Sequence, residues 1–135
     1  MPGKTNEYDV QLSMLLRVPI LAGDPTQSKV FATKSGAKRI FQLADVPVPI
    51  GAFDIYNFDE FCVQLTKLIA HNLYINTWIF KIDDEFNGRG HASLNVENVK
   101  TIVELRKKKV EMTESIIRKL EDVIRKVVPK KTEIA

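Results

Sequence analysis

The spacing of apolar residues predicts three helices in the first half of the chain, over residues 9–17, 29–43 and 59–72. In each stretch apolar side chains recur at intervals of three or four positions, which places them on one face of a helix. The pattern is clearest over 59–72. Asp24 followed by Pro25 is typical of a helix start, because aspartate caps free backbone N–H groups and proline needs no N–H there.

Four other stretches have the composition of strands. RVPILAG (17–23) and residues 52–56 are short and apolar, and INTWIFKID (75–83) is rich in β-branched and aromatic residues. HASLNV (91–96) follows a glycine-containing loop and is expected to return as the second strand of a hairpin. Because strands alternate with helices, the expected fold class is α+β, with an α/β-like order of elements.

The last third of the chain has a continuous helical pattern over 97–128. Apolar residues are spaced alternately by three and four, as in a heptad seam, with interruptions at Arg106 and Thr113. We therefore expect one long amphipathic helix that ends at Pro129. Its apolar seam either packs along its own domain or joins a helix of a partner, and the pattern leaves both interpretations open.

Charge is distributed unevenly along the chain. The 135 residues carry a formal net charge of +3, but eleven lysines and arginines stand against five acidic residues between Lys100 and Lys131. Binding of this basic segment to an acidic partner would weaken as salt rises. Aromatic residues do not interleave with these charges, which argues against nucleic acid as the partner.

Length and cysteine content bound the class of protein. A chain of 135 residues corresponds to one domain or to part of one. Cys62 is the single cysteine, so an internal disulfide is excluded and a reducing compartment is expected. The N-terminal residues lack an apolar signal core, and no apolar run approaches the roughly 18 residues of a membrane span. The sequence thus predicts a cytoplasmic protein without a membrane span.

The segment KIDDEFNGRGHA, which begins at Lys81, holds the candidate chemistry. A lysine at the end of a strand is suited to a phosphate oxygen, and glycines let backbone N–H groups approach an anion. Asn87, Gly88, Arg89 and Gly90 form the centre of this loop. The same pattern fits a hairpin turn that binds nothing, so a plain glycine turn competes with a flap over phosphate. The spacing of a Walker P-loop is absent.

Four blocks in a fixed order bear on this choice: LRVPILAGDP, TKSGAKRIF, VPVPIGAFDIY and FKIDDEFNGRGHA. Over residues 15–95 their order resembles the ATP-grasp fold, and more narrowly the ATP-grasp-type domain of the IQ motif-containing protein H family. The resemblance implies that Lys34, with Lys38 on the same helix, contacts ATP phosphates from one segment. It implies that Lys81 supplies a second phosphate contact and that residues 87–90 form a flap.

The resemblance also implies a domain organisation. Residues 1–26 would be an N-terminal segment with the end of the pre-ATP-grasp region, residues 27–96 the small α+β lobe, and residues 97–135 the long basic helix and tail. The chain would then be the N-terminal half of an ATP-grasp-like fold. ATP-grasp enzymes hold Mg²⁺ with Glu and Asn or Asp residues of a later segment, which has no counterpart in this sequence. We therefore assign no catalytic residue and no metal ligand, and the sequence leaves open whether the chain is an enzyme, with a non-enzymatic role favoured.

The function implied by the resemblance is a nucleotide-binding or degenerate module that serves as a structural part of a ciliary or flagellar assembly. ATP is the expected ligand, with Mg²⁺ only where a further lobe is supplied. In an axonemal, microtubule-associated setting, tubulin or a coiled-coil partner would bind through residues 97–131. Calmodulin is a further candidate, although the sequence has no IQ motif.

Two alternatives remain open at this point. The chain could be a fragment of an ATP-dependent carboxylate–amine ligase whose metal-binding lobe is missing. It could also be a purely structural interaction protein with an empty pocket.

Overall fold

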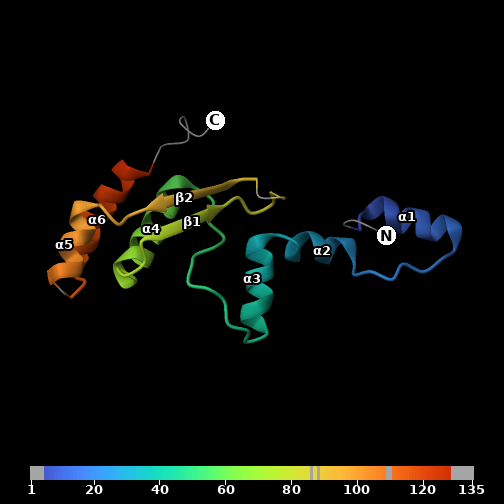
Figure 1. Cartoon of the computed structure of the whole chain (residues 1–135). Coiled ribbons are helices and arrows are strands. Elements are labelled where there is room, and N and C mark those ends of the chain that lie inside the picture. The colour runs from blue at the N-terminus through green and yellow to red at the C-terminus, as the bar shows by residue number, and fades with distance from the viewer. Residues whose placement is uncertain (1–4, 86, 88, 109–110, 129–135) are drawn as a thin grey trace. The chain divides into compact units, whose positions relative to one another are not determined.

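The computed structural model describes residues 5–85, 87, 89–108 and 111–128. The chain forms two compact units, residues 1–48 and residues 49–135. Figure 1 shows that the first unit is helical, whereas the second combines helices with one hairpin. This mixture of helices with a small sheet confirms the expected α+β class.

The first unit contains three short helices, α1 (Glu7–Leu16), α2 (Pro25–Phe31) and α3 (Lys34–Leu43). Each begins at a residue whose side chain accepts hydrogen bonds from the first-turn N–H groups; these residues are Asn6, Asp24 and Thr33. The start predicted at Asp24 and Pro25 is confirmed, as is a helix close to 9–17. Side-chain caps of this kind stabilise a helix end by about 1 kcal/mol.

Two predictions for the first unit are wrong. The helix expected over 29–43 is divided, because Thr33 adopts an extended conformation and caps a new helix that starts at Lys34. The strand expected over 17–23 is absent. Arg17 takes a left-handed conformation that ends α1, and the chain after it pairs with no strand among the described residues.

The second unit contains α4 (Phe58–His71), β1 (Thr77–Lys81), β2 (His91–Asn95), α5 (Lys100–Lys108) and α6 (Glu114–Val127). The helix expected over 59–72 is confirmed, and so is the hairpin. β1 and β2 pair antiparallel, with Trp78 opposite Leu94 and Lys81 opposite His91. The strand expected over 52–56 is absent, and Asp54 in that stretch has a positive φ of 59°, which is incompatible with a regular strand.

One apolar core holds the second unit together. It joins α4, the inner face of the hairpin, α5 and α6, and its fully buried aliphatic side chains are Ile69, Val96, Ile102, Leu120 and Ile124. Trp78 of β1 lies in the same core with only 7% of its surface exposed. Removing a buried aliphatic side chain from such a core would cost about 2–5 kcal/mol.

The single long helix expected over 97–128 is wrong. α5 ends at Lys108, residues 111–113 are not helical, and α6 begins at Glu114 after an extended Thr113. Leu120 and Ile124, which belong to the predicted heptad seam, are buried where α6 packs against α4. At these two positions the seam therefore serves the core of its own chain.

Among the described residues, no helix combines the length and the hydropathy that a membrane crossing requires.

Candidate functional site

The first candidate residues lie at the beginning of α3. Lys34 is its first residue, and Lys38 follows one turn later on the same side of the helix. The Thr33 hydroxyl accepts a hydrogen bond from the Gly36 N–H at 3.0 Å, so the first turn has a defined geometry. No acidic residue lies in this turn. Two lysines at the positive end of a helix dipole create a local field that favours an anion.

A close approach between α2 and α3 holds this turn in place. Ser35 and Gly36 are buried, although the lysines on either side of them are half-exposed. A Cβ atom at Gly36 would lie 2.9 Å from the Cα of Phe31 and closer still to the carbonyl oxygen of Val30. Contacts this short do not occur with a real side chain, so only glycine fits here.

The second candidate group lies at the end of the hairpin. Lys81 is the last residue of β1 and is exposed, on the strand face opposite to the buried Trp78. The Ile82 N–H donates to the Gly90 carbonyl at 2.8 Å, which closes the hairpin after Lys81. Asn87 and Gly90 have positive φ values of 54° and 64°. The loop therefore connects two paired strands and contains left-handed residues.

Two further residues of the predicted flap are Gly88 and Arg89. Arg89 is exposed within the turn. Gly88 lies outside the described residues. Lys34 and Lys38 belong to the first unit, whereas Lys81, Asn87, Arg89 and Gly90 belong to the second. Convergence of the two groups on one ligand stays a prediction.

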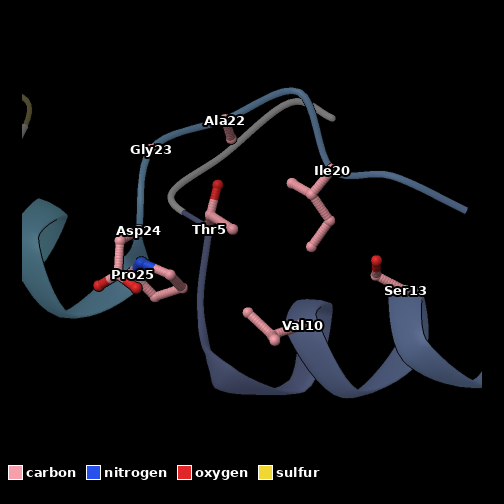
Figure 2. A pocket seen from close by; sticks show the side chains of 8 residues that line it. All are labelled: Thr5, Val10, Ser13, Ile20, Ala22, Gly23, Asp24 and Pro25. Carbon is pink, nitrogen blue, oxygen red and sulfur yellow. The ribbon is translucent and has the colours of Figure 1, made fainter.

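A pocket in the first unit involves none of the predicted residues. It has a volume of about 250 Å³ and lies between α1 and the segment that leads into α2. Figure 2 shows Val10 and Ser13 of α1 directed toward Ile20 across this space. The other lining residues are Thr5, Ala22, Gly23, Asp24 and Pro25. The lining offers hydroxyls and one carboxylate, and the Asp24 carboxylate already caps α2.

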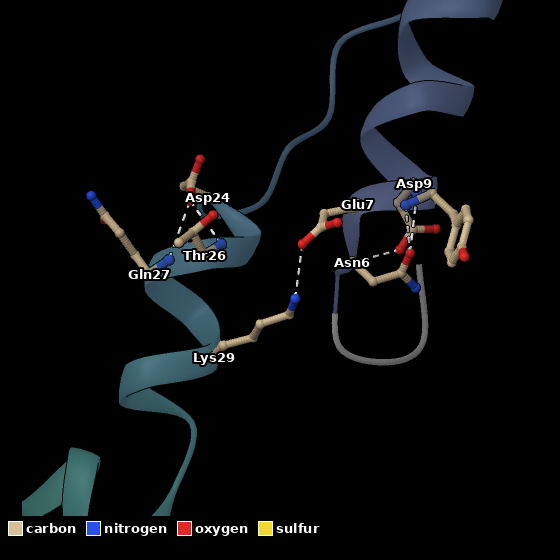
Figure 3. Close-up of polar contacts among 8 residues, drawn as sticks. Asn6, Glu7, Asp9, Asp24, Thr26, Gln27 and Lys29 are labelled. Atoms are coloured by element: carbon tan, nitrogen blue, oxygen red, sulfur yellow. Dashed lines mark hydrogen bonds and ion pairs between the residues drawn. The ribbon is translucent and has the colours of Figure 1, made fainter.

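Figure 3 shows the polar contacts of Lys29, another lysine of the first unit. Lys29 of α2 pairs with Glu7 of α1 at 2.9 Å, and Asp24 accepts hydrogen bonds from the Thr26 and Gln27 N–H groups. The hydrogen bond from Lys29 lowers the pKa of Glu7. Lys29 is therefore engaged in linking α1 to α2.

Cys62 and His71, residue types that often take part in catalysis, have local contacts or burial that account for them without a catalytic role. Cys62 is fully buried in α4, and this burial raises the pKa of its thiol, which disfavours the reactive thiolate. His71 lies within hydrogen-bonding distance of the Lys67 carbonyl, at 2.8 Å. Within the described residues, no group of three His, Cys, Asp or Glu side chains is placed to hold a metal ion.

Two arginines have structural roles that the sequence did not reveal. Arg106 of α5 donates through Nε to the Leu73 carbonyl at 2.6 Å and through Nη2 to the Ile75 carbonyl at 3.4 Å. Arg125 of α6 pairs with Asp59 of α4 and with Glu121 of its own helix. The only sequence signal was the interruption of the heptad seam by Arg106.

Comparison with known proteins identifies the family. Residues 25–133 match the family model described as IQCH-like, ATP-grasp. IQ motif-containing protein H of Danio rerio is 38% identical over 99 residues, which cover 73% of this chain and 9% of that protein. No solved structure matches the chain. The family match includes Lys34, Lys38, Lys81 and the turn at 87–90, and the chain therefore belongs to the IQCH-like ATP-grasp family.

Proposed function

We propose that this chain is the front half of an ATP-grasp-like fold and binds the polyphosphate of a nucleotide through Lys34, Lys38 and Lys81. The observation that carries the proposal is the match of residues 25–133 to an ATP-grasp family model, because it spans all three lysines. On this proposal residues 27–96 correspond to the small lobe, and the turn at 87–90 covers the phosphates.

The beginning of α3 supports the first phosphate contact. Lys34 and Lys38 lie one turn apart at the beginning of α3. Cations at the N-terminal end of a helix oppose its dipole, and a bound anion relieves this repulsion.

The end of β1 supports the second contact. Lys81 is exposed and adjoins a turn in which Asn87 and Gly90 take left-handed conformations. An ammonium group beside such a turn is suited to a phosphate oxygen, because it is a compact charge with three donors. The proposal is confined to binding, and Mg²⁺ enters it only as the counter-ion of ATP.

Titration with Mg-ATP tests the proposal. At about 100 times Kd, the ligand should stabilise the chain by about 2.7 kcal/mol, seen as a rise in Tm. Lys34→Ala and Lys81→Ala should each weaken binding about tenfold in calorimetry, because each removes one charged hydrogen bond. Lys67→Ala is the matched control, since Lys67 is an exposed lysine of α4. An unchanged Tm at millimolar Mg-ATP would refute the proposal.

We also propose that the module serves as a cytoplasmic component of a ciliary or flagellar, microtubule-associated assembly. Exposed cations on α5 and α6 support it: Lys107, Lys108, Lys119 and Lys126 face outward from the core. The acidic surface of tubulin would attract such a surface at low salt.

Microtubule co-sedimentation tests this second part. Pelleting with microtubules should be strong at about 50 mM salt and weak at about 300 mM, because screening shortens the range of charge attraction. Charge reversal at Lys107 and Lys108 should reduce it. Absence of pelleting at low salt, together with absence of a tagged protein from the cilium of flagellated cells, would contradict the assembly role.

A further inference from the structure

We propose that Gly36 is the positioning residue for the phosphate-binding lysines of α3. This inference rests on the proposed function, because it concerns how Lys34 and Lys38 are aimed. Neither the family match nor the sequence pattern assigns a role to Gly36.

The contact geometry carries the proposal. Gly36 packs against the last turn of α2, where an added Cβ would meet the Val30 carbonyl, the Cα of Phe31 at 2.9 Å and the Thr33 hydroxyl at 3.0 Å. Two of these three neighbours are backbone atoms, which cannot rotate away. A side chain at this position would therefore separate α3 from α2.

Helix geometry connects this contact to the lysines. Lys34 and Lys38 each lie two positions from Gly36. With 3.6 residues per turn, this spacing is a rotation of about 200° around the helix axis in one sense, or about 160° in the other. The packed side of α3 is thus opposite to the side that carries the two lysines. The close approach at Gly36 determines which way that lysine side is directed.

The cap adds a second constraint on the same turn. The Gly36 N–H donates to Thr33 Oγ1 at 3.0 Å, so Gly36 is held by its own hydrogen bond as well as by packing. Displacing Gly36 would break this bond and move the start of the helix. Both lysines would move together, because they lie on the same two turns.

The inference predicts a coupled effect on ligand binding. Gly36→Ala should weaken binding of Mg-ATP, and of inorganic triphosphate, by about a hundredfold, as the loss of two charged contacts would. Gly23→Ala is the matched control, because a Cβ at Gly23 meets only the Ser28 hydroxyl at an ordinary 3.5 Å. The control should bind like the parent chain.

A double-mutant cycle separates positioning from general damage. In a Lys34→Ala, Lys38→Ala background, Gly36→Ala should have no further effect on the remaining affinity. The slope of affinity against salt should fall in Gly36→Ala to the value of the double lysine variant. Trp78 fluorescence should report an unchanged unfolding midpoint for the second unit.

Failure of the proposed function and failure of the positioning role give different results. If the parent chain fails to bind Mg-ATP and triphosphate, the proposed function fails, and the positioning role fails with it. If the parent binds and Gly36→Ala binds equally well, or adds its full effect in the background without lysines, the positioning role alone is overturned.

Discussion

At the scale of single residues, backbone conformation limits which side chains the hairpin accepts. Gly90 has a φ of 64°, a region that disfavours residues with a Cβ. An added Cβ would lie 2.8 Å from the Cβ of Ile82. The Gly90 carbonyl also accepts the bond from Ile82 that closes the hairpin. Gly90 was proposed from the sequence as part of a flap, and the structure shows a requirement for glycine that holds with or without a ligand.

Gly90→Ala should therefore destabilise the second unit by about 2–5 kcal/mol, the sum of left-handed strain and overpacking. Unfolding in urea, followed by the fluorescence of Trp78, measures the change, since Trp78 is the single tryptophan and lies in β1. Asn87→Gly is the control, because glycine tolerates the φ of 54° at that position. A midpoint for Gly90→Ala equal to that of the parent would show that the turn rearranges freely.

At the scale of elements, hydrogen bonds and ion pairs from two arginines join the helices of the second unit to one another and to the segment before the hairpin. Arg106 joins α5 to the segment between α4 and β1 by bonding the carbonyls of Leu73 and Ile75. Arg125 joins α6 to the first turn of α4 through Asp59. The hydrogen bonds to Asp59 and Glu121 raise the pKa of Arg125, so the charge persists at all working pH values. These contacts complement the apolar core that the same helices share.

Arg106→Met should destabilise the second unit by about 1–3 kcal/mol, because it leaves two partly buried carbonyls without a donor while keeping the apolar stem. Chemical denaturation of the variant gives the value. Lys107→Met, at the exposed neighbouring position, should change stability by less than about 0.5 kcal/mol. Equal effects of the two substitutions would mean that the Arg106 hydrogen bonds contribute nothing.

At the scale of the whole molecule, the two units differ in how much apolar surface they bury. In residues 5–48 only Pro25, Ser35 and Gly36 are buried, whereas the second unit has a core of large aliphatic side chains. Tyr8, Leu12 and Leu15 recur at helical spacing on α1, and Tyr8 and Leu15 are 80% and 81% exposed. Burial of apolar area is the main source of folding free energy, so the first unit has the smaller share.

Limited proteolysis should therefore cut the first unit before the second. At low protease concentration a fragment that contains residues 49–128 should persist, because cleavage follows local unfolding. Mass spectrometry of the digest identifies the boundary. Loss of both units at the same protease concentration would show that they unfold as one cooperative body.

Local structure was predictable wherever the responsible interactions lie close together in the chain. The Asp24 cap, the helix over 59–72 and the hairpin around Lys81 follow from spacing and from caps within a few residues. The strands expected at 17–23 and 52–56 failed because an apolar run becomes a strand only when another strand pairs with it. Arg17 and Asp54 instead take left-handed conformations.

In the candidate site, too, the local position of Lys81 was predictable, whereas roles that depend on contacts with other elements were not. The sequence placed Lys81 at the end of a strand, and this is confirmed. It placed Lys34 inside a helix over 29–43, whereas Lys34 begins a separate helix, α3. The roles of Gly36 and Arg106 could not be read from the sequence, because each depends on contacts with another element. Gly36 contacts α2, and Arg106 bonds carbonyls more than thirty positions away.

The sequence by itself determined the helical periodicity of 97–128, the cap at Asp24 and the hairpin, since these depend on neighbouring residues. Only the tertiary structure decided that the last helical pattern is two helices. In one straight helix Ile102 and Leu120 would lie about 27 Å apart along the axis. Both are fully buried in a single core with α4, and the interruption after α5 allows both to reach it.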